Sequence, residues 1–143
     1  TTGGSLMDYD AIRAAIKTRL ETVSSPMSFV TVYDHVPDFI TPPCAIVVPA
    51  NNVVTYHEAM GAVNSALHTL RFDIVVAAQR FESNANQETL NDYIVTVPTA
   101  LEADQTLGGL SSAVLVTNAR NYGPLSFADS VFIGIQFDLE CIT

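Results

Sequence analysis

Apolar residues recur at helical spacing near the start of the chain and again after its midpoint. Residues 8–23 predict an amphipathic helix of about four turns. Pro98 falls inside the second repeat, and because proline lacks a backbone donor and collides with the preceding turn, we expect a kink or break with a short further helix starting there. The apolar positions of this second predicted helix are Leu90, Ile94, Val97 and Leu101.

Several other segments have the composition and alternation of strands. Residues 27–33 alternate, and residues 44–48 follow two prolines and are apolar throughout, which predicts a central strand covered on both faces. From Leu70, about ten residues alternate, with the even-numbered positions on one apolar face and Arg71 and Asp73 on the other, and the second half of this strand is apolar on both faces. These segments predict a sheet with one well-buried face.

The last third of the chain predicts two further strands. Residues 113–116 form a short one, residues 122–124 read as a turn, and residues 133–141 alternate with Gln136, Asp138 and Glu140 on the polar side. The order of elements predicts an α+β fold: a mixed, largely antiparallel sheet packed on one face by two helices. Residues 1–143 are expected to form one domain, with residues 1–7 as a flexible tail and residues 51–66 as a protruding hairpin or loop.

The amino-acid composition argues against several classes of function. Of the 143 residues only 15% are charged, and six basic against 15 acidic residues give a net charge of −9. Soluble domains usually carry about 25% charged residues, so much of this surface is uncharged. The acidic balance argues against a protein that grips nucleic-acid phosphates, and no apolar run reaches the roughly 18 residues of a membrane span.

Residues capable of catalysis or metal binding do not form a recognisable motif. The histidines are His35, His57 and His68, and no two of them have the spacing of a zinc motif. Cys44 and Cys141 end apolar runs, where a thiol usually acts as a small buried apolar group. Nucleophile and phosphate-binding motifs are also missing. The sequence therefore predicts no catalytic, cofactor or metal site.

Acidic side chains on the predicted sheet are the remaining polar candidates. Asp73, Asp138 and Glu140 fall on strands that are candidates for neighbours. Such carboxylates usually form a solvated sheet face; the alternative is a subunit interface in which Arg71 or Arg80 of another copy supplies the partner charge. The full set of candidate interface residues is Val53, Val54, Tyr56, His57, Met60, Arg71, Arg80, Arg120 and Tyr122.

One segment carries a resemblance to a known family. Residues 100–109 read ALEADQTLGG and are followed by a predicted strand and by NYGP at residues 121–124. This segment resembles the tail terminator, or tail completion, proteins of long-tailed bacteriophages. In that family an N-terminal helix, a proline-flanked strand like residues 43–49, and a long strand feeding a helix precede an Asp-plus-Leu-Gly-Gly segment and the last two strands. The resemblance covers roughly residues 8–143, and Leu107, Gly108 and Gly109 are its architectural turn.

The resemblance implies a non-enzymatic virion protein at the head-proximal end of the tail, assembled in the host cytoplasm. Such a protein forms a hexameric ring on the tail tube, stops tube polymerisation and presents a docking face to the head connector or neck protein. No cofactor is implied, and the genome DNA passes through the lumen without specific binding. Asp73, Asp138 and Glu140 are the candidate lumen acids, since acidic groups there repel DNA phosphates.

Two alternatives remain open from the sequence. A head-closure or adaptor protein, or a tail tube subunit, would share these features. A small ligand-binding or enzymatic α+β domain is the more remote alternative, because the sequence contains no recognisable catalytic or ligand-binding motif.

Overall fold

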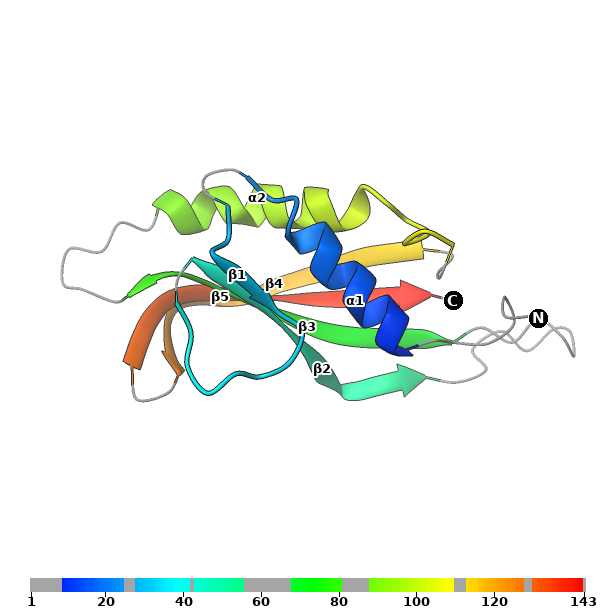
Figure 1. Ribbon diagram of the computed structural model, residues 1–143, viewed down its shortest axis with the longest axis horizontal. Helices are drawn as coiled ribbons and strands as arrows, with labels where there is room; N and C mark the ends of the chain where they lie inside the picture. The colour runs from blue at the N-terminus through cyan, green and yellow to red at the C-terminus, as the bar shows by residue number, and fades with distance from the viewer. Residues whose placement is uncertain are drawn as a thin grey trace, which may run out of the picture.

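The fold is α+β, and in the described residues two helices lie on one face of a five-stranded sheet (Figure 1). The computed structural model describes residues 9–24, 28–41, 43–55, 68–80, 88–109, 113–127 and 130–142. The elements follow the chain in the order α1 (Tyr9–Leu20), β1 (Thr31–Tyr33), β2 (Cys44–Thr55), β3 (Thr69–Arg80), α2 (Glu88–Glu102), β4 (Ala113–Phe127) and β5 (Ser130–Ile142).

The sheet has the strand order β1-β2-β3-β5-β4. β1 runs parallel to β2, and the other neighbours are antiparallel. The predicted mixed and mostly antiparallel sheet is thus confirmed. The run of residues 44–48 lies inside the sheet as expected, although the middle strand is β3. β1 is only three residues long, much shorter than the predicted strand at residues 27–33.

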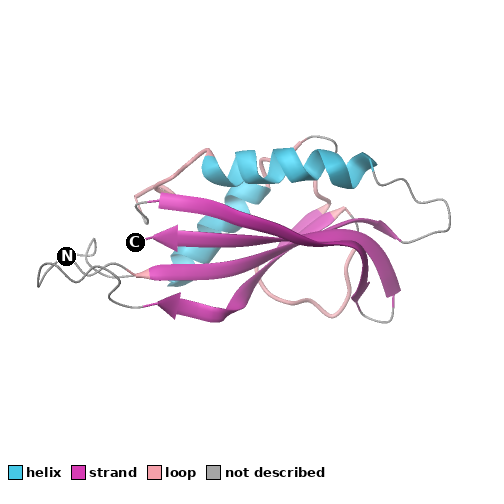
Figure 2. Cartoon of the chain, turned by 180° about the vertical axis from the view of Figure 1, so that it is seen from behind, coloured by secondary structure: helices cyan, strands magenta, loops and turns pink. Residues whose placement is uncertain are grey.

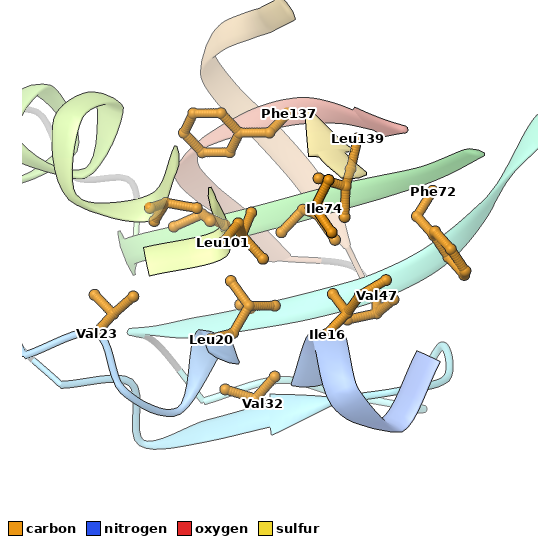
Figure 3. Packing of buried hydrophobic residues seen from close by; sticks show 14 of the residues in the cluster. Ile16, Leu20, Val23, Val32, Val47, Phe72, Ile74, Leu101, Phe137 and Leu139 are labelled. Carbon is orange, nitrogen blue, oxygen red and sulfur yellow. The ribbon is translucent and has the colours of Figure 1, made fainter. Parts of the chain in front are cut away.

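The main core lies between the helices and the sheet (Figure 3). Alternation places the even-numbered side chains of β3 and the odd-numbered side chains of β5 on this side, as predicted. Helix α1 contributes Ile12, Ile16 and Leu20 over β1 and β2, and α2 lies against β4 and β5. Each buried aliphatic or aromatic side chain of this kind contributes about 1.5–3 kcal/mol to folding.

A smaller core lies on the opposite face, where residues 44–48 were predicted to be covered as well. Cys44 and Ile46 of β2 pack there with Ile40 from the β1–β2 loop and with Ala77 and Phe132. This cluster explains why the run is apolar throughout, since it is buried on both faces. Among the described residues, both helices lie behind the sheet in the view from behind, and neither covers this face (Figure 2).

Helix α2 differs from its prediction in two ways. It continues through Pro98 without a break from Glu88 to Glu102. Proline removes the hydrogen bond to the carbonyl of Ile94, but Ile94 is 38% exposed, so water can replace the missing donor. The residue of this turn that faces the core is Tyr93 and not the predicted Ile94. Tyr93 is fully buried, and its ring stacks on that of Phe29 with the ring centroids 5.1 Å apart.

Two predicted boundaries are corrected by the strands. Residues 51–55, expected in a loop or hairpin, continue β2, and Val54 pairs with Leu70 across a register shift. Residues 122–124, expected as a turn, lie inside the 15-residue β4 at a second register shift. Asn121 and Gly123 have positive φ there, so the NYGP signal marks a bulge. Residues 1–8 and 56–67 lie outside the described residues.

Candidate functional site

The polar face of the sheet gathers the predicted carboxylates into one ion-pair cluster. Arg71 of β3 contacts Glu140 of β5, with Nε to Oε2 at 3.3 Å. Arg120 of β4 donates from Nε to Asp138 at 3.0 Å, and its Nη2 lies 3.9 Å from an oxygen of Asp73. The arginine partners therefore come from the same chain, and the cluster does not require another subunit to supply them.

Strand register explains how these five side chains meet. Arg71 lies directly opposite Glu140, and Asp73 lies opposite Asp138, so alternation puts all four on one face. Arg120 joins them because of a bulge: Val116 pairs with Leu139, whereas Asn118 pairs with Asp138. The extra residue, Thr117, reverses the alternation of β4 and turns Arg120 to the polar face. Simple alternation from Val114 and Val116 would place it on the helix side.

A shallow hollow of about 270 Å³ lies over the cluster. Its two arginines and three carboxylates give a formal charge of 2 − 3 = −1. Thr117 and Asn118 of β4 and Asn51 of β2 complete its polar rim. The three candidate lumen acids thus lie together, but the two arginines largely neutralise them, so this surface alone is a weak source of repulsion for DNA.

Burial raises the pKa of Asp73 above its ordinary value, and the nearby carboxylate of Asp138 raises it further. Arg120 acts in the opposite direction without cancelling these two effects. Since the raised pKa favours the neutral acid, the surroundings of Asp73 stabilise its anion poorly.

Replacing Asp73 with asparagine is expected to increase stability at neutral pH. The pKa of Asp73 is higher in the folded chain than its unfolded value of about 3.9, so the folded state binds this proton more tightly. The free energy of unfolding therefore falls as the pH rises from the unfolded pKa through the folded pKa. Asparagine does not titrate and avoids that loss. Urea unfolding should show a gain at neutral pH that disappears in strong acid; a pH-independent difference would contradict this assignment.

The other candidate interface residues are dispersed. Val53 and Val54 are half-buried in β2, and Val54 packs against the main core. The Tyr122 hydroxyl donates to Oδ1 of Asn91 on α2 at 2.6 Å, and the ring remains partly exposed. The backbone of Arg80 ends β3. Tyr56, His57 and Met60 lie outside the described residues.

The thiols and imidazoles that the structure describes do not converge. Cys44 and Cys141 are buried free thiols, and burial raises their pKa to about 11 and about 12. His35 is exposed and lies 3.0 Å from Asp34 in the β1–β2 loop, whereas His68 precedes β3. Within the described part of the chain, no three histidine, cysteine or acidic side chains are grouped to hold a metal ion.

The Leu107-Gly108-Gly109 turn lies between α2 and β4. All three residues have positive φ, at 49°, 71° and 99°. Only glycine adopts these angles readily, and the Gly109 amide closes the turn on the carbonyl of Thr106 at 2.9 Å. The helix itself ends earlier, at Glu102, so the glycines shape the connection rather than the helix end.

Two side chains next to this turn form contacts that the sequence analysis did not predict. Oε1 of Gln105 accepts a hydrogen bond from the backbone N–H of Val114 at 2.9 Å. Oε2 of Glu102 accepts one from the N–H of Val116, also at 2.9 Å. We call this pair the edge caps, because they occupy donors on the side of β4 that faces away from β5. Only the proximity of Glu102 and Gln105 to a glycine turn hints at them in the sequence.

No protein-family model matches the chain, and no curated protein matches it. None of the helices in the described ranges is long and apolar enough to cross a membrane.

Proposed function

We propose that this chain is a structural subunit of a bacteriophage tail that caps the tail tube as a ring and forms the head-tail joining surface. The observation that carries the proposal is the arrangement around the Leu107–Gly109 turn. The elements occur in the order implied by the resemblance to tail terminators. They are an N-terminal helix, a strand after two prolines, a long strand leading to a helix, this left-handed turn and two final strands.

The disposition of basic residues supports passage of DNA without specific binding. Five of the six basic side chains lie in the described residues, and each contacts an acceptor of its own chain. These pairs are Arg13 with Asp10, Lys17 with Glu21, Arg19 with the Ala100 carbonyl, Arg71 with Glu140, and Arg120 with Asp138. Basic side chains that are already paired within the chain bind phosphates poorly, and proteins that bind DNA need several contacts between basic side chains and phosphates.

The test is to add the purified chain to polymerising tail tubes made from the tube protein of the same genome. Negative-stain electron microscopy should show tubes that shorten as more chain is added, with the labelled chain at one tube end. Incorporation along the tube would instead identify a tube subunit. Binding to the head connector without any effect on tube length would identify a neck adaptor. A chain that binds neither tube nor connector contradicts all three structural roles.

A further inference from the structure

The loop between β1 and β2 presents an aromatic side chain to solvent. Phe39 is 72% exposed, the largest fraction among the large apolar side chains of the described residues, and Val36 is 60% exposed. The loop curves away from the sheet beside β2 (Figure 1). Because transfer of an apolar side chain out of water is favourable, a partner that covers these two residues gains free energy. The loop is therefore a candidate contact surface.

Contacts with the rest of the chain hold this loop in place. Ile40 is buried in the smaller core, with only 4% of its surface exposed. The ring of His35 packs edge-on against the ring of Tyr33, with the ring centroids 6.5 Å apart. The amide of Val30 donates to the carbonyl of Pro43 at 2.7 Å. Since a segment that is already fixed loses little conformational freedom on binding, the loop is preorganised for a partner.

An open hollow of about 330 Å³ lies on this loop. Three of the six residues that line it carry an aromatic ring and one is acidic; the lining is Tyr33, His35, Val36, Pro37, Asp38 and Phe39. Asp38 is exposed, and none of the five basic side chains in the described residues pairs with it. Aromatic faces and a carboxylate both attract cations. A guanidinium fits best, because it is planar, weakly hydrated and stacks on aromatic rings.

The charges around the loop narrow the choice of partner. No lysine or arginine occurs between Arg19 and Arg71 in the sequence, a stretch that contains four acidic residues. Lys17 of α1 interacts electrostatically with Asp34, but its ammonium lies 3.8 Å from Glu21. An acidic loop repels phosphates, which argues against nucleic acids and anionic membranes. A second copy of the chain is a poor source of the cation, because its described basic side chains already contact acceptors of their own chain.

We propose that the hollow binds an arginine side chain on an apolar segment of another protein, with the guanidinium against Phe39 and Asp38 and the flanking apolar groups against Val36. The inference goes beyond the proposed function and does not depend on it, because it rests on the shape and charge of this loop alone. An exposed aromatic side chain on a preorganised loop is typical of the residues that dominate an interface.

Titration with a short peptide tests the site. The probe is a leucine-arginine-leucine tripeptide with both ends blocked, added to the isotope-labelled chain while NMR follows the backbone amide signals. We expect saturable shifts at the amides of residues 33–39, with a dissociation constant on the order of millimolar, because a single cation–π contact at an exposed site is weak. The matched probe replaces arginine with citrulline, which keeps the shape without the charge, and should give no saturable shifts.

Two variants separate the ring from the charge. Phe39→Leu keeps an apolar side chain without an aromatic face, and Asp38→Asn removes the carboxylate. Each should raise the dissociation constant about two- to fivefold. Both residues are exposed, and unchanged amide signals outside the loop would verify that each variant folds normally. The control variant is Asp92→Asn, which removes the same charge from an exposed position on α2 and should leave the dissociation constant unchanged.

Other outcomes would overturn the inference. Equal shifts with the arginine and citrulline probes would show an apolar contact without a cation site, and shifts centred outside residues 33–39 would place the binding elsewhere. Shifts at the same amides when the chain alone is concentrated would identify a second copy as the occupant. The tube assay decides the proposed function separately. A chain that caps tubes but does not bind the arginine probe refutes only the loop site, and one that binds the probe without affecting tubes refutes only the proposed function.

Discussion

Replacing Gly134 with alanine is expected to lower the free energy of unfolding by about 1–3 kcal/mol, the usual range for overpacking a core. Gly134 lies in β5 where three strands meet, opposite Ala77 of β3 and Gly123 of β4. A β-carbon built on it would lie 2.6 Å from the carbonyl oxygen of Val76 and 3.0 Å from Cδ2 of Leu125. The side chain of Leu125 can move, but the carbonyl belongs to the central strand, so the sheet itself has to shift.

Urea denaturation of the original protein and of Gly134→Ala measures this effect. Gly108→Ala is the control that distinguishes a steric collision from backbone strain. A β-carbon on Gly108 meets nothing within 4 Å, but its φ of +71° is strained for alanine and should cost about 1–2 kcal/mol. Adding Leu125→Ala to Gly134→Ala should not restore stability, because the Val76 carbonyl remains in place. If Gly134→Ala is as stable as the original, β3 and β5 can move apart to accept the β-carbon without a cost in stability, and the prediction is wrong.

The faces of the long strands could be predicted from the sequence because alternation is a purely local signal. The even positions of β3 and the odd positions of β5 face the helices as expected, since each strand is half-buried along its length. Burial of residues 44–48 on both faces was predicted because this run has no polar alternation, and the structure buries Ala45 and Val47 in the main core and Cys44 and Ile46 in the smaller one. In each case the pattern of apolar residues within a single strand is enough to predict which faces of that strand are buried.

The parts that were missed depend on pairing between distant segments. β4 was predicted to end near Val116, because its later residues are polar or turn-forming. These residues stay in the sheet because β5 continues beside them, and two bulges absorb the irregular stretch. The first bulge also brings Arg120 to Asp138 and Asp73, so no single-strand pattern could reveal that ion pair. The sequence therefore identifies the carboxylates and offers Arg71 as a partner only from another copy, whereas the contact of Arg120 with Asp138 depends on the bulge.

Removing both edge caps is expected to destabilise the fold and to promote association through the edge of β4. Glu102→Ala and Gln105→Ala together delete the acceptors of the Val116 and Val114 amides, each at 2.9 Å in partly buried positions. A hydrogen bond to a charged group contributes about 1.5–3 kcal/mol and a neutral one about 0.5–1.5, which suggests a loss of about 2–4 kcal/mol for the pair. Urea unfolding measures the loss.

Association should follow because an exposed strand edge with unsatisfied donors is a template for pairing with another chain. Among the described strands, β4 pairs only with β5, so the edge caps protect the start of an otherwise open edge. Light scattering should show larger particles for the double alanine variant than for the original at equal concentration.

The matched control is Glu102→Gln with Gln105→Glu, which keeps a side-chain oxygen at each position. That control should recover most of the stability and remain as dispersed as the original. If the control aggregates like the alanine variant, a side-chain oxygen at each position does not prevent association, and protection of the β4 edge by the two caps is ruled out.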